Sequence, residues 1–192
     1  MDSFKSQETY FNGVLYRSKN EAKWACFFDR CGIRYFYEPE TFITSSGKTY
    51  KPDFYLPKYR KYVEVKSSYD SLHNEDMDRK IGEAIDFNET KISNGLIILG
   101  SFPFDVRVIE GLCMDAMWLH WRTGVVVGYV SIYDDNKEIA LHFHDTVIDV
   151  ATCAIPKAAD PSIKLRQIES SSTKLYEAVK YVNDYQFNKY GG

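Results

Sequence analysis

The sequence has none of the features typical of a membrane-spanning or secreted protein. No apolar run in its 192 residues approaches the length of about 18 to 20 residues that a helix needs to cross a bilayer. Residues 1–5 lack the basic segment followed by an apolar one that a secretory signal would show. The four cysteines have no paired CxxC spacing, which argues against a zinc ribbon or a disulfide framework. We therefore expect a cytoplasmic protein with buried free thiols and no membrane contact.

A broad excess of positive charge is also missing. The chain has 24 Lys and Arg residues against 27 Asp and Glu residues, for a net charge of -3. This balance argues against a protein that coats nucleic acid indiscriminately, because such binding depends on neutralising phosphates with basic side chains. Basic residues are nevertheless concentrated in one stretch with few acids, two of which are Asp53 and Glu64. The basic residues are Lys48, Lys51, Lys58, Arg60, Lys61 and Lys66.

The composition is that of a globular protein with an aromatic-rich interior, since 44% of the residues are hydrophobic, 27% charged and 16% aromatic. Apolar residues at helical spacing, ended by Gly32, predict a first helix. Aromatic-rich runs separated by turns predict three strands, followed by a second helix and a strand buried on both faces. The expected bounds are 19–31 for the first helix, 33–41, 50–56 and 62–67 for the three strands, 74–90 for the second helix and 95–100 for the last strand. This order describes an α/β core of roughly 100 residues.

The second half of the chain gives weaker signals. The pattern predicts a β-hairpin with strands over 124–133 and 138–143. Asp160-Pro161 predicts a helix start, and apolar residues at helical spacing continue toward the carboxyl end. We therefore divide the chain into a core of residues 1–101 and an elaboration of residues 102–192, a hairpin plus a helix packed on that core.

Two acids should meet across the hairpin formed by the second and third strands. If the turn is centred between Lys58 and Tyr59, Asp53 lies directly opposite Glu64. Facing acids repel by up to ~1 kcal/mol, and a divalent cation would remove that repulsion. Magnesium suits such a site because it prefers hard oxygen ligands, keeps several waters and takes one or two protein carboxylates together with a substrate phosphate. Phosphodiester cleavage is the reaction that these parts fit, with Mg2+ as cofactor and Mn2+ able to substitute.

Two further residues complete the predicted site. Strand alternation puts Lys66 on the same face as Glu64, where it would orient the attacking water or stabilise the transition state. Glu21 lies at the end of a helical stripe that otherwise faces the core, and from there it can reach the metal. Ser18 and Glu21 also fit a capping box, in which the Glu side chain bonds back to the backbone of Ser18. Both roles stay open for Glu21.

A family resemblance rests on the pattern Pro52-Asp53, ten intervening residues, then Glu64-Val65-Lys66, with Glu21 on the preceding helix. This pattern resembles the PD-(D/E)XK nuclease superfamily, and the wider strings Arg17 to Trp24, Tyr37 to Glu40 and Pro52 to Pro57 are similar to small phage and prophage members.

The resemblance covers about Tyr10 to Ser101 and implies a restriction-endonuclease-like core, α-β-β-β-α-β, with a mixed central sheet flanked by helices. It also implies metal-dependent cleavage of DNA. Asp53 and Glu64 would be the metal ligands, Glu21 an accessory acid and further ligand, and Lys66 the catalytic lysine.

The expected substrate is DNA, and the side chains expected to bind it are Lys19, Lys51, Lys58, Arg60 and Lys61. A homodimer, or a complex with a phage or host recombination or replication protein, is a further expectation, and a phage-encoded protein would act in the host cytoplasm.

Glu38 and Glu40, which flank Pro39, are expected to be exposed charges at the edge of a turn. The alternative is a non-catalytic or partner-activated module of the same fold that binds nucleic acid or protein. The motif does not distinguish an endonuclease from an exonuclease, or DNA from RNA as the substrate.

Overall fold

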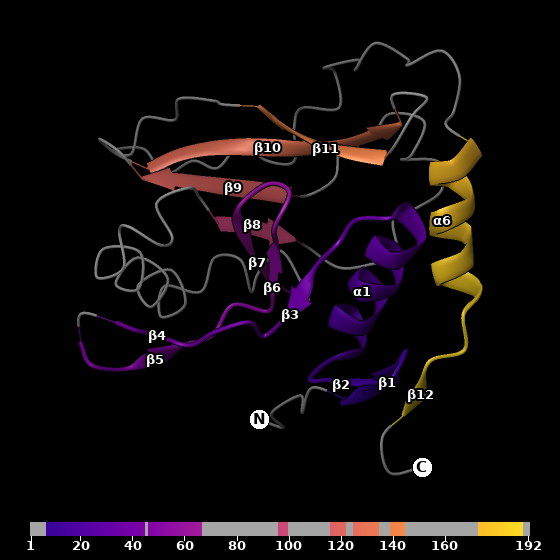
Figure 1. Cartoon of the computed structure of the whole chain (residues 1–192), viewed down its shortest axis with the longest axis horizontal. Helices are drawn as coiled ribbons and strands as arrows, with labels where there is room; N and C mark the ends of the chain where they lie inside the picture. The colour runs from indigo at the N-terminus through magenta and orange to yellow at the C-terminus, as the bar shows by residue number, and fades with distance from the viewer. Residues whose placement is uncertain are drawn as a thin grey trace, which may run out of the picture.

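A computed structural model of the chain describes residues 7–44, 46–66, 96–99, 116–121, 125–134, 139–144 and 173–189. These residues form a mixed α/β structure with two helices, a seven-stranded sheet and two smaller sheets (Figure 1). Neither helix in this part of the chain is long and apolar enough to cross a bilayer. The predicted helix over 74–90 and the predicted helix start at Asp160-Pro161 lie outside the described residues.

The strands form three sheets. The largest has the order β11-β10-β9-β8-β7-β6-β3, a three-stranded sheet has the order β12-β1-β2, and β4 and β5 form a two-stranded sheet. Within the largest sheet β7 and β8 are parallel and the other neighbouring pairs antiparallel, so the sheet is mixed, as predicted. The bounds are β1 Thr9–Phe11, β2 Val14–Tyr16, β3 Phe36–Tyr37, β4 Phe42–Ile43, β5 Thr49–Tyr50, β6 Phe54–Leu56, β7 Lys61–Val65, β8 Leu96–Leu99, β9 Ala116–Trp121, β10 Val125–Asp134, β11 Ile139–His144 and β12 Asn188–Lys189.

The first helix, α1, has the predicted bounds Lys19–Cys31. It begins at Ser18, which has extended backbone and whose hydroxyl accepts a hydrogen bond from the Glu21 N–H at 3.1 Å. Such a cap stabilises a helix by ~1 kcal/mol. The helix ends at Gly32, whose φ of 68° lies in the left-handed region that favours glycine.

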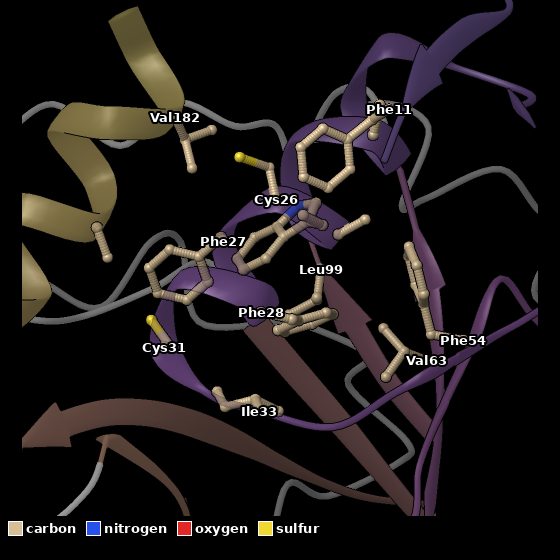
Figure 2. Packing of buried hydrophobic residues seen from close by; sticks show 14 of the residues in the cluster. Phe11, Cys26, Phe27, Phe28, Cys31, Ile33, Phe54, Val63, Leu99 and Val182 are labelled. Carbon is tan, nitrogen blue, oxygen red and sulfur yellow. The ribbon is translucent and has the colours of Figure 1, made fainter. Parts of the chain in front are cut away.

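The core lies between α1, the large sheet and the second helix, α6 Thr173–Asp184. Phe28 of α1 contacts Phe54 of β6 edge-on, with 5.6 Å between the ring centroids. Val179 and Val182 of α6 are buried against the same cluster. Figure 2 shows side chains from α1, β6, β7, β8 and α6 meeting in this core. These contacts hold α1 against the sheet.

The β6–β7 hairpin has the predicted register. Phe54 pairs with Val63, so the next positions toward the open end of the hairpin are Asp53 and Glu64. Val63 is completely buried in the core, whereas Glu64 and Lys66 contact each other on the opposite face. The predicted alternation along β7 is therefore confirmed.

Two predicted strands are broken where prolines interrupt them. The stretch 33–41 contributes only the two-residue β3 to the large sheet, and the stretch 50–56 is divided between β5 and β6. Pro39 and Pro52 lack the N–H that a sheet interior requires, so the chain leaves the large sheet between them. The intervening β4–β5 hairpin projects away from that sheet (Figure 1). The prediction of two uninterrupted strands was wrong for this reason.

The predicted hairpin over 124–133 and 138–143 is confirmed as β10 and β11, which are antiparallel. Both extend the large sheet through β9, so residues on either side of position 101 contribute to one sheet. The domain boundary at 101 stays a prediction.

Candidate functional site

Three buried carboxylates gather where α1 begins and the β6–β7 hairpin opens. Asp53 directly precedes β6, Glu64 lies near the end of β7, and Glu21 lies in the first turn of α1. Asp53 is 2% exposed, Glu64 6% and Glu21 7%. Asn20 links α1 to the end of β7, because its side-chain amide donates a hydrogen bond to the carbonyl oxygen of Lys66 at 3.0 Å. Acids are rarely buried to this extent unless they are paired, hydrogen-bonded or bound to a cation.

The Asp53 carboxylate is held by one backbone donor and one cation. Its Oδ2 accepts a hydrogen bond from the Val65 N–H at 2.7 Å, and its Oδ1 lies 2.5 Å from Nη2 of Arg17. The backbone contact fixes the carboxylate to β7. The contact with Arg17 links the carboxylate to the residue that directly precedes Ser18, the cap of α1.

The Glu64 carboxylate has two side-chain partners. Its Oε1 lies 2.5 Å from the Lys66 ammonium, and its Oε2 accepts a hydrogen bond from the Tyr50 hydroxyl at 2.9 Å. The Lys66 side chain is only 14% exposed. The predicted placement of Lys66 beside Glu64 is therefore confirmed, and β5 adds a tyrosine that the sequence did not single out.

Glu21 combines a capping role with a place beside the other acids. Its Oε1 accepts a hydrogen bond from the Ser18 hydroxyl and its Oε2 one from the Tyr37 hydroxyl, each at 2.7 Å. Its charge also acts on Asp53, whose pKa it raises. The predicted capping box is therefore present in part, because the Glu21 side chain bonds to the hydroxyl of Ser18 and not to its backbone. The role of Glu21 as a direct metal ligand stays a prediction.

Burial raises the pKa of the Asp53 carboxyl well above its usual range, and the negative charges of Glu64 and Glu21 raise it further. The hydrogen bond from Val65 and the charge of Arg17 oppose this effect without cancelling it. The protein environment therefore disfavours an ionised Asp53 when no further cation is present. A divalent cation would reverse that preference, because metal binding favours the deprotonated carboxylate.

Replacing Asp53 by Asn should change how stability depends on pH in the presence of a chelator. Because the pKa of Asp53 is higher in the folded protein than in the unfolded chain, where it is about 3.9, the folded state binds more protons over the interval between the two values. The free energy of unfolding of the wild type should therefore fall relative to that of Asp53→Asn as the pH rises from about 4 to the folded-state pKa. Urea denaturation of both proteins across this range measures the difference.

The matched control is Asp184→Asn, since Asp184 is exposed on α6. It shows how far an acid-to-amide substitution outside the site changes the pH dependence of stability. A pH dependence for Asp53→Asn no larger than that of this control would show that Asp53 carries no unfavourable charge in the folded protein.

Arg17 and Glu38 belong to this cluster but were not predicted as site residues. Nε of Arg17 lies 2.7 Å from Oε1 of Glu38, and the Lys51 ammonium lies 3.0 Å from Oε2 of the same carboxylate. The expectation that Glu38 is an exposed turn-edge charge was wrong, because its side chain is only 21% exposed and pairs with two cations. Glu38 also has φ 43°, an unusual backbone conformation for a residue that precedes a proline.

Glu40 also differs from its expectation. Its carboxylate accepts a hydrogen bond from the Tyr62 hydroxyl, and the residue is half-buried. Glu40 therefore contacts the face of β7 that carries Glu64.

The five residues expected to bind nucleic acid lie in two places. Lys19 begins α1 and Lys51 pairs with Glu38, so both are near the acids. Lys58 and Arg60 lie in the β6–β7 turn and Lys61 begins β7, at the closed end of the hairpin. A strand rises about 3.3 Å per residue, which puts the turn on the order of 10 Å from Asp53. Their contact with nucleic acid stays a prediction.

The donor set suits a two-carboxylate site better than a dedicated metal cage. Within the part of the chain that the structure describes, no group of three or more His, Cys, Asp or Glu side chains is arranged to hold a metal ion. Asp53 and Glu64 nevertheless supply the hard oxygen ligands that Mg2+ prefers, and Mg2+ commonly takes only one or two protein carboxylates. The side-chain cations Arg17 and Lys66 now lie against these two acids.

Comparison of the chain with protein-family models, with curated proteins and with solved structures finds no significant match. The function is therefore inferred from the residues and the geometry of the site.

Proposed function

We propose that the chain is a metal-dependent nuclease that hydrolyses phosphodiester bonds in DNA, an endonuclease of phage or prophage type with a restriction-endonuclease-like core. The observation that supports this most strongly is the burial of Asp53 and Glu64 at adjacent positions across the β6–β7 hairpin, with Lys66 in contact with Glu64. A buried acid whose pKa is raised by burial and by neighbouring charges, as that of Asp53 is, is typical of a catalytic site.

Asp53 and Glu64 would hold Mg2+, and the bound ion would supply an acidified water as nucleophile together with charge stabilisation at the phosphate. Lys66 would donate a hydrogen bond to the attacking water or to a phosphate oxygen as negative charge develops. The contact with Glu64 limits the positions open to its ammonium. Glu21 adds negative charge that strengthens cation binding at Asp53.

A second candidate is a non-catalytic or partner-activated module of the same fold. The observation that favours it is that each of the three acids already has protein donors, including Ser18 and Tyr37 for Glu21 and Tyr50 for Glu64. Such a polar network is also what a purely structural cluster requires.

Cleavage of labelled linear, supercoiled, single-stranded and branched DNA, with Mg2+, Mn2+ or chelator, tests the proposal. We expect the wild type to cut at least one substrate with metal and none with chelator. Glu64→Gln should lose this activity by about 10²-fold or more, because it removes a charged ligand while keeping the size of the side chain. Glu177→Gln, an exposed change on α6, is the matched control and should cut like the wild type.

Cleavage that survives in Glu64→Gln would remove the site from the mechanism. Failure of the wild type to cut any of the substrates, with the folded protein intact, would favour the binding module.

A further inference from the structure

Arg17 reaches from the surface into the site and covers Asp53. Its Nη2 lies 2.5 Å from Asp53 Oδ1, and its Nε lies 2.7 Å from Glu38 Oε1. The Arg17 side chain is 52% exposed, whereas that of Asp53 is 3% exposed. The backbone N–H of Arg17 donates to the Tyr37 hydroxyl at 3.0 Å, which fixes the main chain at this point. The main chain is therefore anchored while the side chain lies partly in solvent.

The two oxygens of Asp53 accept hydrogen bonds from donors of different mobility. Oδ2 is bound by the Val65 N–H, which belongs to β7 and cannot turn away. Oδ1 is bound by the Arg17 side chain, which can adopt other rotamers. A divalent cation at Asp53 would stand next to the guanidinium, and two positive charges in a poorly solvated site repel each other. Binding of the cation should therefore displace Nη2 of Arg17.

We propose that Arg17 is a further functional residue of this site, which pairs with Asp53 in the metal-free protein and turns to bind a phosphate of the nucleic acid when a divalent cation binds Asp53. This inference rests on the proposed function. The charge of Glu38, whose Oε1 lies 2.7 Å from Nε in an ion pair, favours a position of the guanidinium at the rim. The released donors would therefore stay next to the place where the substrate phosphate would meet the cation. The planar guanidinium presents several donors in a geometry that matches phosphate oxygens.

The first test is the affinity for Mn2+ alone, without nucleic acid, in the wild type and in Arg17→Gln. Because Arg17 and the cation compete for Asp53, removing the guanidinium should tighten Mn2+ binding by about 10-fold. Titration calorimetry measures this. Arg34→Gln is the matched control, since Arg34 is exposed and lies over the Phe36 ring, and its Mn2+ affinity should equal that of the wild type.

The second test is binding of a short fluorescein-labelled duplex DNA, with Lys66→Ala present in every protein so that cleavage during the measurement is greatly slowed. With Mn2+, Arg17→Gln should bind this DNA about 10-fold more weakly, and the slope of log affinity against log salt should fall by about one phosphate contact. With chelator the same substitution should change the affinity by less than about 2-fold, because Arg17 is then engaged by Asp53.

Arg17→Lys provides a variant that keeps the positive charge. Its Mn2+ affinity should stay within about 3-fold of the wild type, whereas its DNA affinity in Mn2+ should fall, because an ammonium cannot contact Glu38 and a phosphate as one planar group. This pattern would separate the proposed role from a general loss of structure, which would weaken both kinds of binding in both variants.

Equal Mn2+ affinities in the wild type and Arg17→Gln would overturn the inference while leaving the proposed function intact, provided that the wild type binds Mn2+ and cuts DNA. A wild type that neither binds Mn2+ nor cuts would overturn both. Tighter Mn2+ binding together with metal-dependent weakening of DNA binding supports the inference.

Discussion

Replacing Lys66 with alanine is expected to reduce metal-dependent DNA cleavage by about 10²- to 10³-fold, the loss typical of removing one donor that stabilises developing charge. The Lys66 ammonium lies beside Glu64 and is largely buried, so water cannot readily take over its role. Affinity for Mn2+ should be unchanged or somewhat tighter, because the substitution removes a positive charge from the neighbourhood of a metal ligand. Single-turnover cleavage and Mn2+ titration of the same preparation separate these two effects.

Lys180→Ala is the matched control, because Lys180 is exposed on α6, which contributes none of the site residues. It should cut at the rate of the wild type. A Lys66→Ala protein that cuts at the wild-type rate would remove Lys66 from the mechanism. Loss of cleavage together with loss of Mn2+ binding would give Lys66 a structural role instead.

Replacing Phe28 with alanine is expected to lower the free energy of unfolding by ~3 to 5 kcal/mol, as large-to-small substitutions of buried aromatics do. Phe28 is 1% exposed, and its ring contacts those of Phe54 and Trp24 with centroid distances of 5.6 and 5.8 Å. The cavity would lie between α1 and the strand that follows Asp53. Urea denaturation monitored by circular dichroism measures the loss.

Phe36→Ala removes an aromatic ring of the same size from β3, at the edge of the sheet. Phe36 is 45% exposed, so its loss should cost about 1 kcal/mol or less. Comparable losses for Phe28 and Phe36 would mean that α1 does not pack on the sheet as described.

The helix α1 could be predicted to the residue because its signals are local. Ser18 caps the amino end through its own side chain, and Gly32 ends the helix with a backbone conformation that other residues seldom adopt. Neither signal depends on the rest of the fold.

The register of the β6–β7 hairpin could be predicted for a related reason. The turn is short, and a shift by one residue would move Val63 out of the core and Glu64 into it. The facing positions of Asp53 and Glu64 follow from that register, and so does the contact between Glu64 and Lys66.

The features of the fold and of the site that the sequence did not predict depend on contacts between distant segments of the chain. The ion pair of Arg17 with Asp53 joins residues 36 positions apart, and no spacing rule indicates it. The three-stranded sheet pairs Thr9 of β1 with Lys189 of β12, and these residues lie near opposite ends of the described chain. The strands β4 and β5 leave the large sheet between two prolines, Pro39 and Pro52. The effect of a proline on strand pairing can be predicted only when the neighbouring strands are known.

Titration of the protein with Mn2+, followed by electron paramagnetic resonance, tests most directly the claim that Asp53 and Glu64 hold a divalent cation. We predict saturable binding by the wild type and by Lys66→Ala, and binding weakened by about 10-fold or more in Glu64→Gln and Asp53→Asn, since each loses a charged ligand. Equal Mn2+ affinity in all four proteins, or no saturable binding by the wild type, would contradict the claim.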